Sequence, residues 1–231
     1  MGWFDEIVAG TQMVLDWAAR HGVARVLFLS SGAVYGPQPI GLHAIPESFH
    51  AMPDPLVASN VYGVSKRAGE HLCALYSAQR GLQVLIARLF SFVGRDLPQG
   101  GHLAIGNFIR DALTRDAITV SGDGTPLRTY LDQADLAHWL LTLLDQGRPG
   151  EAYNVGSDEV VSIAELAYRV RDLLAPDKPV LIQGQGSDAQ GRNRYIPDIR
   201  KAQRELGLAV TIPLAEAIRR TGAAHRGEIF L

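Results

Sequence analysis

Hydrophobic and polar residues alternate in two ways along the first ninety positions, one helical and one extended. Apolar side chains recur near every third or fourth position over residues 4–20, and His21-Gly22 follows, which predicts a helix that ends there. Residues 24–30 are a short apolar run between turn residues, typical of a strand buried on both faces of a parallel sheet. Residues 83–89 form a second such run. The order helix, strand, helix, strand predicts an α/β fold with a parallel sheet.

The helix between the two runs is predicted to begin at Ser59 or Asn60, either of which is a good N-cap, and to end at Arg80 before Gly81. Its predicted apolar stripe consists of Val61, Val64, Ala68, Leu72 and Leu75. A long loop rich in proline precedes this helix, and loops of that length in compact domains usually carry function. Because ligands bind at the carboxyl ends of parallel strands, we expect a site near Ser30-Ser31 and Phe90-Ser91.

The pattern changes after Gly94. Helices are predicted near residues 105–113, 134–144, 162–174 and 214–220, with strands near 118–120 and 180–183 and a turn at Gly122-Asp-Gly. We therefore expect residues 1–95 to form the C-terminal half of a Rossmann-type domain. Residues 96–231 should form mainly a smaller α/β lobe, with some segments returning to the first sheet.

Composition excludes several classes of protein. Hydrophobic residues make up 47% and charged residues 20% of the 231 positions, as in a folded globular protein. The net charge of −2, without a run of like charges, gives no reason to expect nucleic acid as a partner. The single cysteine, Cys73, can form no internal disulfide, so we interpret it as a core residue and the protein as cytoplasmic. No apolar stretch approaches the roughly 20 residues of a membrane span, and no signal peptide is visible.

Tyr62 and Lys66 are the residues that most clearly suggest chemistry. They stand at positions i and i+4 of the second predicted helix, so their side chains are neighbours on one face. A tyrosine is a poor base at neutral pH, but a nearby ammonium favours the phenolate and makes the side chain a usable base. Spacing alone leaves two interpretations open, a catalytic pair and an exposed helical pair.

Several ordered motifs together resemble extended short-chain dehydrogenases/reductases of the NAD-dependent nucleotide-sugar epimerase/dehydratase family. The motifs of the first half are Val26-Leu-Phe-Leu-Ser-Ser-Gly-Ala-Val-Tyr-Gly36, Tyr62-Gly-Val-Ser-Lys66 and Arg88-Leu-Phe-Ser-Phe-Val-Gly94. Those of the second half are Gly122-Asp-Gly-Thr-Pro-Leu-Arg-Thr-Tyr130, Asp132, Tyr153-Asn-Val-Gly156 and Arg194-Tyr-Ile-Pro-Asp-Ile199. The similarity extends from about residue 10 to about residue 208.

This resemblance implies a role for individual residues. Ser31 would hydrogen-bond the reacting sugar oxygen, Tyr62 would be the base, and Lys66 would hold the nicotinamide ribose. Ser30 and Phe90 would also lie at the cofactor. The substrate would be a nucleotide sugar, contacted by Asn107, by Ser91, and by Arg128 with Arg192 or Arg194 at the diphosphate; each arginine has the alternative of being a solvated surface charge.

Two neighbouring residues bear on the reaction. In the 4,6-dehydratases of the family an acidic pair follows the active-site hydroxyl, whereas this chain has Gly32-Ala33, which transfer no proton. This departure disfavours dehydration and leaves 4-epimerisation, ketone reduction, or oxidation followed by decarboxylation. Epimerisation needs the least additional chemistry. Ser91 stands where the strand motif of the family often ends in asparagine, which leaves the sugar open.

The cofactor-binding motif of the family has no counterpart in this chain. A glycine-rich turn between a strand and a helix should hold the pyrophosphate of NAD, or of NADP, which stays open; no G-x-G-x-x-G follows a strand here. The strand at residues 24–30 would then lack a neighbour on one side. A non-catalytic nucleotide-sugar-binding fragment is the alternative function. The resemblance also implies a homodimer through the helices at residues 4–20 and 60–80.

Overall fold

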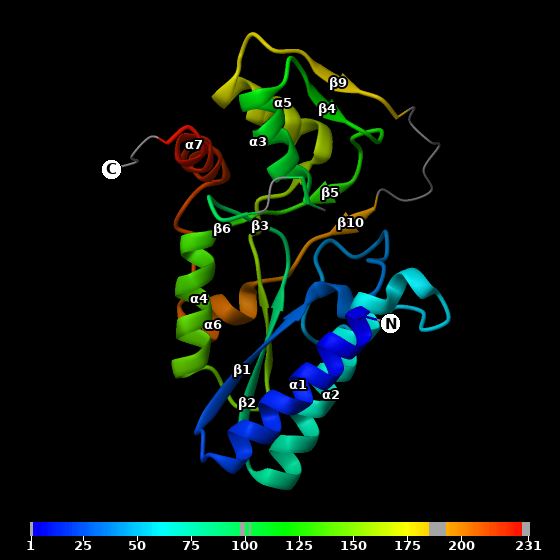
Figure 1. The fold of residues 1–231 in the computed structure, drawn as a ribbon, viewed down its shortest axis with the longest axis vertical. Helices are drawn as coiled ribbons and strands as arrows, with labels where there is room; N and C mark the ends of the chain where they lie inside the picture. Colours follow the sequence, from blue (N-terminus) through cyan, green and yellow to red (C-terminus); the bar gives the residue numbers. More distant parts are fainter. Residues whose placement is uncertain (1, 98–99, 102, 185–192, 228–231) are drawn as a thin grey trace. The chain divides into compact units, whose positions relative to one another are not determined.

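A computed structural model describes residues 2–97, 100–101, 103–184 and 193–227, and these form two compact units (Figure 1). Unit 1 comprises residues 1–90, 138–155 and 197–209, and unit 2 comprises residues 91–137, 156–196 and 210–231. Each unit is discontinuous in sequence, so a boundary at residue 95 stays a prediction. The predicted α/β class is confirmed by the parallel sheet and the helices packed on it.

The sheet of unit 1 is parallel and has the order β1-β2-β7. Its strands are β1 (Arg25–Ser31), β2 (Gln83–Leu89) and β7 (Ala152–Val155), and Ser31 of β1 lies beside Leu89 of β2. In the described part of the chain, β1 pairs with β2 alone and therefore forms an edge. The expectation that this strand is buried on both faces was wrong, because Leu29 at the edge is 43% exposed.

Helices α1 (Gly2–Arg20) and α2 (Val61–Arg80) pack against each other beside this sheet. Both predicted helices are confirmed, and Gly81 ends α2 in the left-handed conformation, with φ of 68°. The predicted apolar stripe of α2 is half-buried apart from Leu75, which is exposed, and Leu72 packs against the core of unit 1. The buried residues of this helix are the small ones, Gly63, Ser65, Gly69 and Cys73, because only small side chains let the helix backbone approach the sheet.

The start of α2 also differs in detail from the prediction. Asn60 occupies the N-cap position, but its side chain donates to the carbonyl of Asp54 instead of capping the helix. A short 3-10 turn, η2 (Ala58–Asn60), leads into the helix. Another, η1 (Gly32–Tyr35), follows β1 directly.

The remaining helices of unit 1 come from segments that lie far from α1 and α2 in the sequence. Helix α4 (Gln133–Gln146) begins in unit 2 and continues in unit 1, where Trp139 is fully buried and donates to the carbonyl of Ala209. Helix α6 (Arg200–Leu206), which the hydrophobic pattern did not predict, contacts β7. Tyr153 of β7 joins α6 through a 2.9 Å hydrogen bond to Glu205.

Unit 2 is built around three helices and several short strands. The helices are α3 (Ala104–Thr114), α5 (Ile163–Leu174) and α7 (Leu214–His225), the last longer than predicted. Two pairs are β3 (Phe92–Val93) with β6 (Leu131–Asp132) and β4 (Ile118–Val120) with β9 (Val180–Ile182). In a third sheet, β5 (Leu127–Arg128) is central and pairs with β10 (Arg194–Tyr195) on one side and β8 (Val161–Ser162) on the other. Buried aliphatic residues of the helices and of β4 form its core.

Cys73 lies in the core of unit 1 with a relative exposure of 1%, which confirms its interpretation as a structural residue. Across the described ranges, no helix is both long and apolar enough to cross a membrane.

Candidate active site

The carboxyl end of β1 presents two buried hydroxyl groups. Ser30 is 2% exposed and donates a 2.6 Å hydrogen bond to Glu70 of α2. Ser31 is 7% exposed and its Oγ accepts from the backbone N–H of Ala33, so that it caps η1. These contacts fix the backbone at the strand end, where the resemblance implies that Ser31 faces the reacting sugar.

Tyr62 and Lys66 lie on the first turns of α2. The Nζ atom of Lys66 lies 5.9 Å from the centre of the Tyr62 ring, as the i, i+4 spacing predicts. The same ammonium donates to the carbonyl of Leu29 at 2.7 Å and lies 5.3 Å from the Phe28 ring. Burial in this environment lowers the pKa of Lys66. Tyr62 is 38% exposed, and its ring is in edge contact with Trp3 of α1 at 5.7 Å.

Successive turns of α2 are fixed to the segment that follows β1. Gly63 lies so close to η1 that a Cβ atom there would be 2.6 Å from the carbonyl oxygen of Ala33. One turn later, Arg67 donates to the carbonyl oxygens of Val34 and Ala51. The helix that carries Tyr62 and Lys66 is therefore held against the strand end and turn that carry Ser31.

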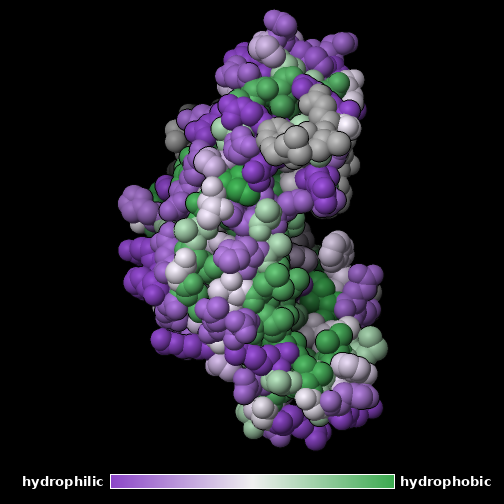
Figure 2. All heavy atoms as spheres, turned by 90° about the vertical axis from the view of Figure 1, so that its left-hand side faces the viewer, coloured by the Kyte–Doolittle hydropathy of each residue, from purple (hydrophilic) through white to green (hydrophobic). Residues whose placement is uncertain are grey.

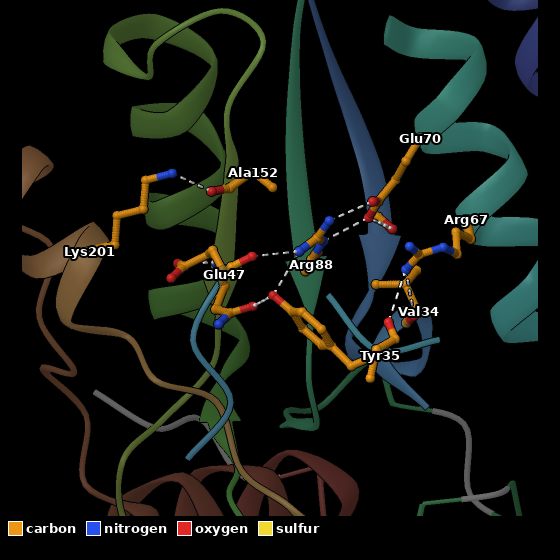
Figure 3. A network of polar contacts seen from close by, with 11 residues as sticks. Val34, Tyr35, Glu47, Arg67, Glu70, Arg88, Ala152 and Lys201 are labelled. Atoms are coloured by element: carbon orange, nitrogen blue, oxygen red, sulfur yellow. Dashed lines mark hydrogen bonds and ion pairs between the residues drawn. The ribbon is translucent and has the colours of Figure 1, made fainter. Parts of the chain in front are cut away.

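A buried ion pair completes this attachment and was not predicted from the sequence (Figure 3). Arg88 of β2 donates from Nε and Nη2 to the two carboxylate oxygens of Glu70, at 2.9 and 2.7 Å. The two side chains are 14% and 11% exposed. Arg88 is the charged residue of the predicted buried strand β2. Because arginine is rarely buried unless it is paired, its presence there was the sequence signal for a buried acidic partner.

The network continues from Arg88 to residues distant in sequence. Arg88 donates to the hydroxyl of Tyr35, which donates to Oδ1 of Asn154, and Glu47 accepts from the backbone N–H of Asn154. Burial raises the pKa of Tyr35 to about 12, and it also raises the pKa of Glu47. The Tyr35 hydroxyl therefore stays protonated at neutral pH and serves as the donor to Asn154.

Phe90 and Ser91 follow β2 at the point where the chain leaves unit 1. Phe90 is 5% exposed, and its ring lies 6.4 Å from that of Tyr35. Ser91, in unit 2, is 7% exposed, and its carbonyl accepts from the N–H of Leu131.

Unit 2 contains a cleft of about 700 Å³, within the range of small-molecule sites. Asn107 of α3 lies on it, together with Arg110 and the glycine turn that follows β4. The Asn107 side chain donates to the carbonyl of Gly101 and accepts from Arg110. The predicted substrate residue thus lines a cavity of suitable size.

Arg128 of β5 is half-buried and has carbonyl groups as hydrogen-bond partners, Leu127 O at 2.8 Å and Asn193 O at 3.0 Å. Burial lowers its pKa. Among the described residues no carboxylate forms an ion pair with it, so its charge is available to an anion.

The predicted arginines are not all brought together. Strand β10 runs beside β5 with Tyr195 opposite Arg128 and Arg194 opposite Leu127. Because adjacent residues of a strand point to opposite faces, the side chains of Arg128 and Arg194 leave opposite faces of this sheet. The Nε atom of Arg194 is buried and has no hydrogen-bond partner within the described ranges. Arg192 lies outside the described residues.

A sequence profile of the NAD dependent epimerase/dehydratase family matches residues 3–156, which is more than half of the chain. The chain belongs to this family. UDP-glucuronic acid decarboxylase 1 of Danio rerio is 32% identical over 212 residues, an alignment that covers 92% of this chain and 49% of that protein. The chain therefore spans about half the length of this curated relative.

Solved structures support the same fold. The UDP-glucose 4-epimerase of Thermotoga maritima, in complex with UDP-glucose, aligns with a TM-score of 0.84 at 21% identity and covers 97% of this chain and 70% of that one. A dTDP-glucose 4,6-dehydratase of Streptomyces venezuelae, with NAD and TYD bound, aligns with a TM-score of 0.80 at 27% identity, over 97% and 66% of the two chains. These proteins are Rossmann-type enzymes that act on nucleotide sugars, and the specific reaction differs among the relatives.

Proposed function

We propose that this chain supplies the acid/base residues and the nucleotide-sugar lobe of an NAD-dependent 4-epimerase-type enzyme. The observation that carries the proposal is the attachment of α2 to the end of β1, which holds Tyr62 and Lys66 beside the turn capped by Ser31. A fixed acid/base group beside a fixed hydroxyl is what repeated proton transfer at one sugar oxygen requires.

In the proposed mechanism Tyr62 accepts the proton of the sugar C4 hydroxyl, while Ser31 hydrogen-bonds the same oxygen. Lys66 keeps the phenolate favourable through its nearby positive charge. NAD, when bound, would supply the hydride acceptor and donor for C4. Tyr62 then gives its proton back to the C4 oxygen after the sugar has turned over, so that the hydroxyl has the opposite configuration.

Lys66 and its neighbours fit the nicotinamide-ribose end of the cofactor. The ammonium of Lys66 is fixed by a strand carbonyl beside Tyr62, a position from which it can donate to ribose hydroxyls. Nothing comparable exists for the pyrophosphate, because the sequence has no G-x-G-x-x-G turn. We therefore assign to this chain the ribose contacts through Lys66, with Ser30 and Phe90 near the nicotinamide, and we infer that the pyrophosphate is held by a polypeptide segment outside this chain. Whether the nucleotide is NAD or NADP depends on that segment.

The nucleotide sugar is proposed to bind unit 2. Asn107 and the cleft of about 700 Å³ suit a nucleoside. The guanidinium of Arg128, which forms no ion pair with a carboxylate among the described residues, suits a diphosphate. Ser91, Arg192 and Arg194 remain proposed contacts on the basis of the resemblance. A binding measurement with UDP alone tests this assignment without requiring turnover.

Gly32 and Ala33 bear on the choice of reaction. Neither residue can deliver or accept a proton, so elimination of water from the 4-keto sugar has no acid in the place where the dehydratases carry one. Oxidation followed by decarboxylation is the second candidate, since a relative with 32% identity is a UDP-glucuronic acid decarboxylase. Oxidation at C4 of a glucuronic acid makes the C6 carboxylate a β-keto acid, which can lose CO₂ without a further protein acid.

Two measurements test these proposals. In the chain combined with a cofactor-binding half, UDP-glucose and UDP-glucuronic acid are supplied with NAD, and the products are separated. A 4-epimer supports epimerisation, whereas a pentose nucleotide with released CO₂ supports decarboxylation. Tyr62→Phe should remove turnover of either kind, by about 10²-fold or more, with UDP affinity unchanged. Persistent turnover in Tyr62→Phe would refute the assignment of the base.

The alternative from another class is a non-catalytic fragment that binds nucleotide sugars. The chain combined with a cofactor-binding half separates the cases. Binding of UDP-glucose in calorimetry without turnover in that combination, in the presence of NAD, favours the fragment, and turnover there would exclude it.

A further inference from the structure

Glu70 connects three separate elements of unit 1 through one carboxylate. It lies on α2 and accepts from Ser30 at the end of β1 at 2.6 Å and from Arg88 of β2 in a bidentate pair. Figure 3 shows Glu70 reaching from its helix to the strand that carries Arg88. We refer to Glu70, Arg88 and Ser30 as the carboxylate joint.

The joint is rigid because it is buried and fully paired. Bidentate arginine–carboxylate pairs fix geometry as well as supplying energy, and both side chains here are largely shielded from water. Burial alone would lower the pKa of Arg88, but the hydrogen bonds and the charge of Glu70 outweigh that effect and the pKa is raised. Loss of either partner leaves an uncompensated buried charge, which strongly destabilises comparable pairs.

The place of Glu70 along α2 relates the joint to the candidate active site. Tyr62, Lys66 and Glu70 stand at i, i+4 and i+8 and therefore form one row along the helix. Ser30, at the other side of the joint, immediately precedes Ser31. The joint thus bonds the row that carries the acid/base residues to the strand end that carries the hydroxyl.

We propose that Glu70 and Arg88 are positioning residues that set the location of Tyr62 and Lys66 relative to Ser31. Their catalytic importance rests on the proposed function, but the positioning itself does not. Rotation or translation of α2 would change both the distance of Tyr62 from Ser31 and the contact of Lys66 with the Leu29 carbonyl. Lys66 can therefore report the position of the helix without any turnover.

The chain is well suited to this measurement, because its lysines are Lys66, Lys178 and Lys201. Reductive methylation with ¹³C-formaldehyde labels each ammonium, and NMR then follows the titration of each; Lys66→Arg assigns the signal. Burial is the cause of the lowered pKa of Lys66, so a change in this pKa reports a change in its surroundings. Glu70→Gln should move the Lys66 titration upward toward 10.5, the ordinary value, because the ammonium becomes more exposed, while Lys178 and Lys201 stay unchanged. Loss of the Glu70 charge alone would move the Lys66 titration downward, so the direction separates movement of the helix from loss of the charge.

Glu205→Gln is the matched control. Glu205 also joins a helix of unit 1 to the sheet, through Tyr153, but it lies on α6. This variant should leave the Lys66 titration as in the wild type. An unchanged or lowered Lys66 titration in folded Glu70→Gln, or an equal rise in Glu205→Gln, would overturn the proposal.

If Glu70→Gln does not fold, a double variant tests the same proposal. Glu70→Met combined with Arg88→Met removes both charges together, a replacement that proteins often tolerate without loss of stability. The Lys66 titration should again rise, because the attachment to Ser30 and β2 is gone. A wild-type titration in this folded variant overturns positioning by the joint. If Tyr62→Phe retains turnover, the proposed function fails, but the titration of Lys66 still decides the role of the joint.

Discussion

Replacement of Gly63 by alanine tests whether α2 is held as closely to η1 as the structure indicates. In an open helix the change from glycine to alanine stabilises a protein by about 0.5–1 kcal/mol, because it lowers the entropy of the unfolded chain. At Gly63 the added Cβ would lie 2.6 Å from Ala33 O and 3.2 Å from Pro53 Cγ. The closest atom belongs to the backbone, so η1 or the helix must shift, and overpacking of this kind costs about 1–3 kcal/mol.

The matched control is Gly10→Ala in α1, where no atom lies within 4 Å of the added Cβ. We expect Gly10→Ala to be stabilising and Gly63→Ala to be destabilising, with a difference of about 1–3 kcal/mol between them. Trp3, Trp17 and Trp139 are the tryptophans of the chain, and all lie in unit 1, so tryptophan fluorescence in urea reports the unfolding of this unit. Equal stabilisation by both substitutions, at unchanged m-value, would refute the close approach.

Three further predictions concern pH, ligand binding and assembly. Burial raises the pKa of Cys73 to about 12 from 9.0, so the stability contributed by its protonated thiol is complete below pH 9 and is lost as the pH rises toward 12. Between pH 9 and 10 the free energy of unfolding should fall by up to about 1.4 kcal/mol per pH unit, and Cys73→Ala should flatten this slope in urea titrations. Arg128→Met should weaken UDP binding about 10- to 100-fold in calorimetry, since charge-assisted hydrogen bonds are lost, whereas Arg219→Met, an exposed residue of α7, should not. We also propose that the chain is a homodimer through α1 and α2, and a monomer in sedimentation at all concentrations would contradict this.

Hydrophobic periodicity predicted the elements that have a strong local signal. The helices α1, α2, α3 and α5 and the strands β1, β2 and β4 lie within a few residues of their expected positions. The two-residue strands β5 and β10 were not predicted, because a pairing of residues 127–128 with residues 194–195 leaves no periodic trace in either segment. The fully buried positions of α2 were not predicted for a related reason, since the pattern ranks apolar residues, whereas the tightest packing of this helix uses glycine, serine and cysteine.

The surface of unit 1 carries an apolar groove whose lining residues the hydrophobic pattern did not predict. A groove of about 450 Å³ lies along the free edge of β1 and α1, and most of its lining is apolar, with Lys66 among the lining residues. Apolar side chains also gather in the lower part of the face in Figure 2, which belongs to unit 1. The loss of a neighbouring strand was expected from the missing motif, but the place of Lys66 beside that edge depends on the packing of α2. The carboxylate joint was also beyond prediction, because its partners are 18 and 40 residues apart and only the charge of Arg88 hinted at it.

The proposed acid/base residues belong to unit 1, and the proposed contacts of Arg128 and Asn107 with the nucleotide belong to unit 2. Each assignment can therefore be tested separately from the other. Tyr62, Lys66, Glu70 and Ser31 are held by contacts inside unit 1, and Arg128 with the Asn107 cleft is held inside unit 2. Arg128→Met should therefore weaken UDP binding without moving the Lys66 titration, and Glu70→Gln should move the Lys66 titration without weakening UDP binding. Sites that share no partners behave additively in this way. A substitution that changed both signals would mean that nucleotide binding in unit 2 and the position of α2 in unit 1 are energetically coupled, and a double-mutant cycle of Glu70→Gln with Arg128→Met would then measure that coupling.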